Sequence, residues 1–569
     1  MCGEQGAGIG AHRVEPSVPE RDLLWQRLLG RPVSVAQALS IDLSFTGGSL
    51  LTSNFIPPDT MGAGGPDHFV ELLNGRYTVY RNADGVPVQT STLNDFWRAA
   101  GVVPAGGFAF DPRVTYDASS RRWVAASVDN SGAPNNFLVA VSTSSDPTQG
   151  WKGFAISSDS AQSRRADFPT IGVNRDGVYL AANMFPITAS STTTSVLVLP
   201  KADLIAGTVA HKTLFENVNP GSTGFSIQPV DDPRSTGVPV EILLSAFNTG
   251  AGQFKRSDIA GSVTSPVLDT TDKFIPVPPF GGPPNALQPG PKAPLDVGDT
   301  RVSSSVVMRQ GELWGVQSVN SGGRSALRWF DIDIATNTLR QSGLIGSRTL
   351  AFYYGSIAVN DFGDVVIGFS GSGPAQFVSA YAVQGHTQDG VTTFGDPLLL
   401  KAGVSDYEVT FGAGRNRWGD YSATTLDPDD PSRFWTIQEW VSATNIWSTQ
   451  ITELDVAPVP EPPTLLLWGA TVTALGLSAR WRGRRQGRQR LHFLFGPARV
   501  GSDQILPSGA LQRGARRRAS GNTQALDAPN ADRQESWKTP GIRPLVPPAT
   551  GAPSAPPPRG GSTQGGSLQ

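Results

Sequence analysis

The stretch FDPRVTYDASSRRWVAASVD, residues 110–129, contains two short apolar segments separated by a polar turn. Aromatic and Asp residues lead the first segment, and the second, RWVAASVD, is more apolar. Short segments with β-branched and aromatic side chains, bounded by turn residues, are typical of β-strands. The stretch therefore predicts two strands joined by a tight turn.

The same pattern recurs along the chain. Its clearest further copies are ADFPTIGVNRDGVYLAANMF (166–185), GDTRVSSSVVMRQGELWGVQSV (298–319), YYGSIAVNDFGDVVIGFSG (353–371) and WGDYSATTLDPDDPSRFWTIQEWV (418–441). Two weaker copies are HFVELLNGRYTVY (68–80) and GFSIQPVDDPRSTGVPVEILLSAFN (224–248). The copies begin about 50 to 70 residues apart, which is the spacing of four-stranded propeller blades.

We therefore expect an all-β fold, a β-propeller of about seven four-stranded blades, over residues 51–455. Six or eight blades, or a pair of β-sandwiches, are the alternatives. Segment 270–298 is dense in Pro and Gly, and we expect it to be a long connection between blades.

The composition agrees with such a fold. The chain of 569 residues has 64 Gly, 46 Pro and 17% charged residues, which suits an all-β protein with many turns. Its net charge of −2 favours no nucleic-acid partner. Cys2 is the one cysteine of the sequence, which excludes an intrachain disulfide and a cysteine-based zinc site. Stability must then come from a large hydrophobic core.

A composite signal lies near the C-terminus. Pro460-Glu461-Pro462 precede the uncharged run TLLLWGATVTALGLSA (464–479), and four arginines follow it: Arg480, Arg482, Arg484 and Arg485. The run predicts a short transmembrane helix, and the arginines should hold its end on the cytoplasmic side. A buried core helix after a proline-rich linker is the alternative interpretation.

The order of these parts resembles the PEP-CTERM sorting signal of exported Gram-negative proteins, over residues 459–485. The resemblance implies that an exosortase-type transpeptidase cleaves near Pro460, Glu461 and Pro462. It also implies a transient stay in the inner membrane before release to the cell surface. The chain continues beyond the usual end of the pattern, and the Arg-, Pro- and Gly-rich residues 486–569 predict a disordered tail.

The N-terminal residues 1–50 are polar and predict an irregular segment. Ala36-Gln37-Ala38 has the form of a leader cleavage site, but no uninterrupted apolar run precedes it. A wrongly assigned start of the chain is one interpretation. A cytoplasmic scaffold protein is the other.

The body from Met61 to Leu454 resembles exported bacterial β-propeller proteins that often carry PEP-CTERM tails. The resemblance rests on MGAGGPDHFVELLNG (61–75), FDPRVTYD (110–117), VAVSTSSDPTQGW (139–151) and RWGDYSATTLDPDD (417–430). It implies a fold and a location but no reaction. We therefore expect a non-catalytic binding or structural role, with extracellular polysaccharide or surface proteins as partners.

The segment SSDPTQGW (144–151) is also similar to the Asp-box of sialidase-type propellers. Ser144, Asp146 and Trp151 occupy matching places, and Thr148 stands where the box has Gly. In that box the Asp caps a turn and the Trp packs between blades, so its role is structural.

The alternative function is a sialidase-like glycan-processing hydrolase or lyase with its site at the mouth of the central channel. Such a site needs arginines that clamp a carboxylate, a Tyr nucleophile with a Glu partner, and an acidic Asp. The low-ranked catalytic candidates are Asp111, Arg113, Asp299 and Arg301, which should face one end of the channel, with Arg417, Asp420, Tyr407 and Glu408 as further members. Structural bridges between neighbouring blades are the simpler interpretation of the Arg–Asp pairs.

One acidic turn is a candidate calcium site. Asp427, Asp429 and Asp430 offer the oxygen ligands that calcium prefers. Their spacing differs from that of a dedicated calcium loop, and solvated Asp-Pro turns are the other interpretation. No other cofactor is indicated.

Overall fold

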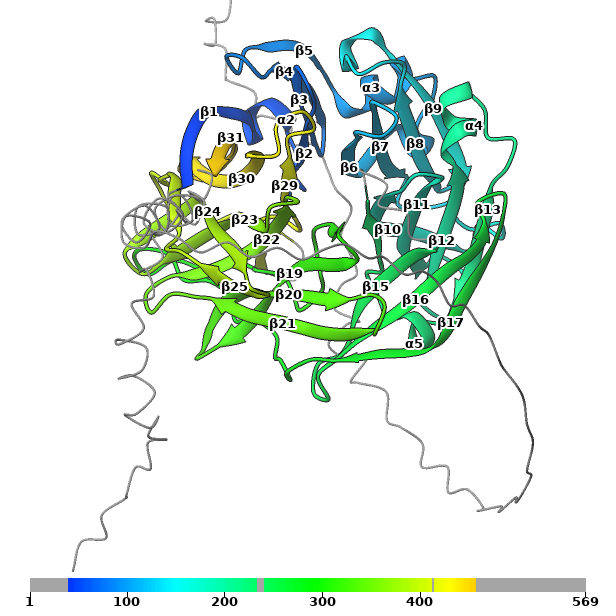
Figure 1. The fold of residues 1–569 in the computed structure, drawn as a ribbon. Coiled ribbons are helices and arrows are strands. Elements are labelled where there is room, and N and C mark those ends of the chain that lie inside the picture. The colour runs from blue at the N-terminus through cyan, green and yellow to red at the C-terminus, as the bar shows by residue number, and fades with distance from the viewer. Residues whose placement is uncertain (1–38, 233–239, 412–413, 457–569) are drawn as a thin grey trace, which may run out of the picture. The chain divides into compact units, whose positions relative to one another are not determined.

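Seven β-strands lie side by side around a common centre in the part of the chain that the structure describes, residues 39–232, 240–411 and 414–456 (Figure 1). The structure is a computed structural model, and all described residues belong to one compact unit. The seven inner strands are β2 (Met61–Gly64), β6 (Ala109–Asp117), β10 (Arg164–Val173), β14 (Gln228–Asp231), β18 (Val306–Arg309), β22 (Ala351–Val359) and β29 (Ala423–Leu426). Each contacts the next, and β29 contacts β2, so the ring is closed.

Each inner strand begins an antiparallel sheet that extends outward. The outer strands are β3 (His68–Leu73), β4 (Arg76–Arg81) and β5 (Pro87–Ser91); β7 (Arg122–Asp129), β8 (Asn136–Ser142) and β9 (Trp151–Ser157); β11 (Gly177–Pro186), β12 (Thr193–Pro200) and β13 (Thr213–Val218); β15 (Glu241–Asn248), β16 (Gln253–Ser262) and β17 (Ser265–Pro276); β19 (Glu312–Ser321), β20 (Arg324–Asp333) and β21 (Thr338–Ile345); β23 (Asp364–Gly373), β24 (Gln376–Gln388), β25 (Val391–Phe394) and β26 (Leu398–Lys401); β30 (Arg433–Ala443) and β31 (Ile446–Val456). This arrangement confirms the predicted all-β propeller.

The remaining elements are short. They are the helices α2 (Leu50–Ser53), α3 (Leu93–Ala99), α4 (Lys201–Ala206) and α5 (Pro220–Thr223), the 3-10 turns η1 (Ala105–Gly107) and η2 (Pro147–Gln149), and the strands β27 (Thr410–Phe411) and β28 (Arg415–Asn416).

The ring is closed by the N-terminal strand β1 (Leu39–Ser49), which pairs with β31 and completes the last sheet. Leu39 lies opposite Val456, and Phe45 lies opposite Ile451. The prediction of an irregular segment over residues 1–50 is therefore wrong for residues 39–49. The alternation in LSIDLSFT is that of a strand with one covered face, and its partner strand lies at the other end of the body. Residues 1–38 lie outside the described residues.

Two further expectations need correction. The predicted copy at 68–80 consists of the second and third strands of its sheet, because its inner strand is the small-residue segment Met61–Gly64. The segment 270–298 begins inside β17, where Phe274 pairs with Lys255 of β16. β-Bridge pairing of Ala286 with Leu295 then organises part of the connection to β18.

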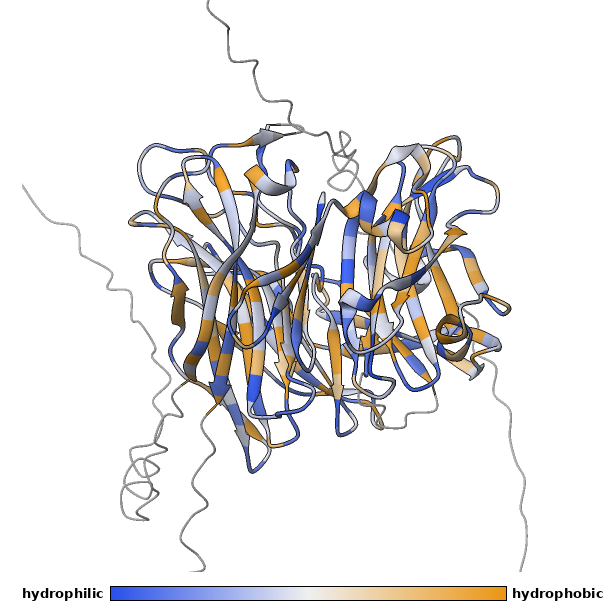
Figure 2. Ribbon diagram, turned by 90° about the horizontal axis from the view of Figure 1, so that it is seen from above, coloured by the Kyte–Doolittle hydropathy of each residue, from blue (hydrophilic) through white to orange (hydrophobic). Residues whose placement is uncertain are grey.

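Hydrophobic side chains fill the spaces between adjacent sheets. The ribbon in Figure 2 shows hydrophobic and polar residues interspersed along the strands. Close approach of the sheets requires small residues at particular points. A Cβ atom added to Gly64 would lie 2.4 Å from the indole of Trp435, so the last sheet packs directly on the backbone of the first. The inner strands β14 and β18 even pair in parallel, with Val230 opposite Val306.

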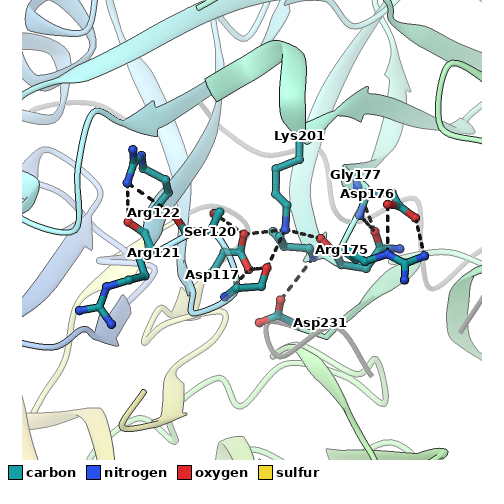
Figure 3. A network of polar contacts seen from close by, with 12 residues as sticks. Asp117, Ser120, Arg121, Arg122, Arg175, Asp176, Gly177, Lys201 and Asp231 are labelled. Carbon is teal, nitrogen blue, oxygen red and sulfur yellow. Dashed lines mark hydrogen bonds and ion pairs between the residues drawn. The ribbon is translucent and has the colours of Figure 1, made fainter. Parts of the chain in front are cut away.

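A buried ion pair joins two neighbouring sheets at the end of the ring where the inner strands finish (Figure 3). Lys201 Nζ lies 2.6 Å from Asp117 Oδ2 and also donates to the carbonyl of Asn174 at 2.7 Å. Both charged side chains are nearly inaccessible to water, at 7% and 0%. Each ion therefore depends on the other to compensate its burial.

We expect Lys201→Met to lower the free energy of unfolding by about 3–5 kcal/mol, because Asp117 would remain buried without its cation. Chemical denaturation of the purified protein measures this change. The control is Arg175→Met, which removes an exposed pair with Asp176 and should cost less than about 1 kcal/mol. Equal losses of unfolding free energy in the two variants would contradict the stabilising role of the buried Lys201–Asp117 pair.

Candidate functional site

The inner strands begin at one end of the ring, where a small depression is lined by Asp299, Arg301, Tyr354 and Asp420. We call this depression the channel mouth. The backbone has positive φ at Asp111, Phe168 and Tyr354, and the strand register shifts beside each of them. These bulges change the direction of neighbouring side chains.

Three arginines at or beside the channel mouth pair with carboxylates two or three residues away in the chain. The contacts are Arg165 Nη1 to Asp167 Oδ2 at 2.9 Å, Arg301 Nη2 to Asp299 Oδ2 at 2.8 Å, and Arg417 Nη2 to Asp420 Oδ2 at 2.6 Å. The second and third pairs are bidentate. Burial alone would raise the pKa of Asp299, but Arg301 lowers it below its ordinary value. The arginines of all three pairs thus already hold carboxylates.

Arg113 lies inside the ring and is 2% exposed. Its Nε donates to the carbonyl of Pro169 at 2.8 Å, and its Nη1 donates to that of Ser303 at 3.1 Å. The guanidinium carbon lies 3.4 Å from the centre of the Tyr421 ring. One side chain from β6 thus contacts segments of three other sheets.

Asp111 and Arg113, predicted as a pair, take separate partners. Asp111 Oδ2 accepts a hydrogen bond from the backbone N–H of Phe168 at 2.9 Å, whereas Arg113 donates to carbonyls of other sheets. The bulge between Phe110 and Arg113 separates the two side chains. Asp111, Asp299, Arg301 and Asp420 do gather at one end of the channel, as expected, and the Arg301 guanidinium lies over the Phe168 ring at 4.6 Å.

Three buried carboxyl groups lie behind the channel mouth. Burial, and then the charges of Asp167 and Asp420, raise the pKa of Asp111 to about 7. Burial and nearby carboxylates raise the pKa of Asp59 well above its ordinary value. Burial raises the pKa of Glu439 to about 8, although Thr60 donates to its Oε1 at 2.8 Å. Carboxyl groups with raised pKa values therefore lie close to the Arg–Asp pairs.

Sequence analysis missed Asp59, Glu439 and the Arg165–Asp167 pair. Arg165 and Asp167 are two residues apart, like Asp299 and Arg301 but in the opposite order. This spacing could have identified the pair from the sequence. Glu439 and its partner Thr60 are 379 residues apart, so no local pattern joins them.

The proposed Tyr–Glu pair is not assembled. Tyr407 is fully buried, with its ring 4.9 Å from the ring centre of Trp418. The Glu408 carboxylate points to the surface, where Lys292 Nζ lies 2.9 Å from its Oε2. The two side chains therefore cannot act together on one substrate.

The Asp-box segment has the expected structural role. Asp146 Oδ1 accepts from the backbone N–H of Thr148 at 2.9 Å and so caps η2. Trp151 Nε1 donates to the carbonyl of Pro147, and its ring lies 5.2 Å from that of Phe96 in helix α3, which follows the neighbouring sheet.

The acidic turn at 427–430 is held by its own backbone. Asp427 Oδ1 accepts from the N–H groups of Asp429 and Asp430, each at 2.9 Å, and its Oδ2 accepts from Trp435 Nε1 at 3.2 Å. Across the described ranges, no group of three or more His, Cys, Asp or Glu side chains is arranged to hold a metal ion.

The sorting-signal residues lie outside the described residues. These are Pro460, Glu461 and Pro462, the run 464–479, Arg480, Arg482, Arg484 and Arg485, and the tail 486–569. Among the helices of residues 39–456 that the structure describes, none has the length and apolar character needed to cross a bilayer.

No family model and no curated protein matches this chain. Among solved structures, it is similar to the Trypanosoma rangeli sialidase at 10% identity and a TM-score of 0.32, over 77% of this chain and 63% of the sialidase. It is also similar to the GH43 endo-arabinanase from Bacillus licheniformis at 11% identity and a TM-score of 0.28, over 61% and 99% of the two chains. The chain thus spans less than two thirds of the sialidase's length. Similarity at this level carries no argument about a reaction or ligand.

We expect Arg113→Met to lower the free energy of unfolding by about 3 kcal/mol or more, because two buried carbonyl oxygens lose their donor. Thermal and urea unfolding measure the loss. Arg121→Met is the control, since Arg121 is exposed and 3.5 Å from Asp429, and it should change stability by less than about 1 kcal/mol. A fully stable Arg113→Met would refute the structural role.

Glu439 should make stability depend on pH. Burial raises its pKa from the ordinary 4.5 to about 8 in the folded protein, so between these values the folded state binds more protons than the unfolded state. The free energy of unfolding should therefore fall as pH rises from about 4.5 to about 8. Glu439→Gln, which is uncharged throughout, should show a smaller fall. Urea unfolding of both proteins across this pH range measures the two pH dependences. An identical pH dependence in both would contradict the raised pKa of Glu439.

Proposed function

We propose that this chain is an exported, cell-surface β-propeller that binds or organises extracellular polysaccharide or surface proteins without catalysing a reaction. The observation that carries this proposal is the pairing at the channel mouth. A carboxylate-binding glycosidase would need free arginines, but Arg165, Arg301 and Arg417 are each engaged by an Asp close by in the sequence. A substrate carboxylate would have to displace that Asp, at the cost of leaving it partly buried without its cation.

The connections around the mouth support a role for this surface. Inside the ring, Arg113 ties segments of neighbouring sheets together through its hydrogen bonds to the carbonyls of Pro169 and Ser303. The connections that lead from an outer strand to the next inner strand lie at this end, and they expose apolar side chains. Leu51 is 72% exposed, Val103 78% and Val404 59%. Apolar contacts on loops held by a rigid scaffold suit the binding of a sugar face or of a partner protein.

The location in this proposal rests on the sequence alone. The PEP-CTERM-like signal at 459–485 would direct the chain to the inner membrane and to an exosortase-type transpeptidase. The arginines at 480–485 would keep the end of the apolar run in the cytoplasm. Release after cleavage would place the propeller outside the cell of a Gram-negative bacterium.

A glycan-processing hydrolase or lyase is the second candidate function. One observation favours it: Asp111 has a pKa raised by burial to about 7, whereas Asp420, although buried, has its pKa lowered by Arg417. Two carboxyl groups with pKa values shifted in opposite directions are the usual basis of acid–base roles.

The test is a binding and turnover assay with the purified chain and the producing cell's extracellular polysaccharide. Val103→Asp should weaken binding by about tenfold, because it places a charge in an apolar contact. Val86→Asp is the matched control: Val86 is 45% exposed and lies in a turn at the opposite end of the ring, so binding should not change. The polysaccharide should be recovered at its original chain length.

Shortened chains released by the wild type, and not by a folded Arg301→Ala or Asp111→Asn variant, would overturn the non-catalytic proposal in favour of the enzyme. Sizing the mature protein in cell fractions tests the location. A full-length chain found in the cytosol alone would contradict export.

A further inference from the structure

Both ends of the described chain leave the ring at the end opposite the channel mouth. The inner strand β29 runs away from the mouth and finishes at Leu426, where the turn 427–432 begins. The backbone N–H of Val456, the last residue of β31, donates to the carbonyl of Ser432 in this turn at 3.0 Å. Leu39, the first residue of β1, lies opposite Val456. We call this end of the ring the exit end.

A short tether separates the exit end from the apolar run near the C-terminus. Seven residues, 457–463, lie between Val456 and Thr464, the first residue of that run. The eight backbone steps from Val456 to Thr464 reach at most about 29 Å, whatever their conformation. If the run 464–479 anchors the chain in the membrane, Val456 therefore stays within that distance of the bilayer.

The channel mouth is farther from Val456 than this tether can reach. β31 has 11 residues, from Ile446 to Val456, and steps of about 3.3 Å give it a length of about 33 Å. The turn that precedes Ile446 and the other connections of the mouth add to this length. With the mouth against the bilayer, Val456 would stand farther from the lipid than the reach of about 29 Å allows. The length of the tether therefore excludes this orientation.

Exposed apolar side chains lie at the exit end, close to the point where the chain leaves the ring. Phe362, in the turn between β22 and β23, is 66% exposed, and Val391, at the start of β25 in the same sheet, is 60% exposed. Asn360 Nδ2 donates to the carbonyl of Pro431 at 2.9 Å, and Pro431 belongs to the turn that holds Val456. Aromatic side chains are favoured at the boundary between lipid headgroups and water. The exit end thus presents a suitable side chain beside the tether.

We propose that the exit end of the ring faces the bilayer while the chain is anchored, and that the channel mouth points away from it. This inference rests on the membrane anchor of the proposed function. The partner of the exit end is a lipid surface, and Phe362 and Val391 lie on the side that faces it. The surface around the mouth is then open to extracellular polymers before the chain is cleaved, so binding there does not have to wait for release.

Single-cysteine labelling of the full chain in vesicles of phosphatidylethanolamine and phosphatidylglycerol tests this orientation. Cys2→Ser first removes the one cysteine of the sequence. A fluorophore attached to Phe362→Cys reports on the exit end, and one attached to Thr444→Cys, in the exposed turn between β30 and β31, reports on the mouth end. Energy transfer to an acceptor dye on the lipid headgroups should be at least about twofold more efficient from position 362, because the length of β31 separates the two ends.

A longer tether is the matched control. An insert of about 20 Gly and Ser residues between Val456 and Ala457 leaves the ring unchanged and more than triples the greatest reach of the tether. The difference in energy transfer between the two positions should then shrink, and an undiminished difference would overturn the tether as its cause.

Two results separate this inference from the proposed function. Equal transfer from both positions with the natural tether, or stronger transfer from position 444, would overturn the orientation while leaving the anchor intact. A chain that does not sediment with the vesicles would contradict the anchor itself, and with it the orientation.

Discussion

The pairing of β1 with β31 is the constraint on which the rest of this structure depends. A four-stranded sheet cannot cover both of its faces, and each sheet here is covered by its two neighbours. That mutual covering is complete only when the last sheet meets the first. Residues 39–49 supply the outer strand of that last sheet, and the inner strand β29 then contacts β2. The channel and its mouth exist because the ring is closed.

Inside the ring, burial sets the chemistry. Ions removed from water need partners, and the Arg–Asp pairs at the mouth provide them within two or three residues of the chain. Carboxyls without such a partner, such as Glu439, keep a proton instead. Arg113 does not pair with Asp111 of its own strand, and its Nε and Nη1 donate to the carbonyls of Pro169 and Ser303.

The repeated strand-turn-strand pattern predicted most of the hairpins, because strand alternation and turn residues are local signals. It failed where the local signal was weak. Met61–Gly64 is an inner strand made of small residues, which carry no β propensity. Residues 270–276 were predicted to belong to a linker because of their composition, yet β16 pairs with them as an edge strand. In each of these cases the neighbouring strand, and not the segment's own composition, decides its conformation.

The sequence by itself determined that the body is all-β, that it is built from about seven similar units, and that Arg and Asp recur where those units begin. Each of these properties depends on patterns of residues that lie a few positions apart in the sequence. Only the tertiary structure decided that Arg113 turns to the axis while Arg301 stays paired at the mouth, and that Thr60 meets Glu439. Bulges and ring closure bring together groups hundreds of residues apart, and their protonation and pairing depend on burial that no local pattern of residues encodes.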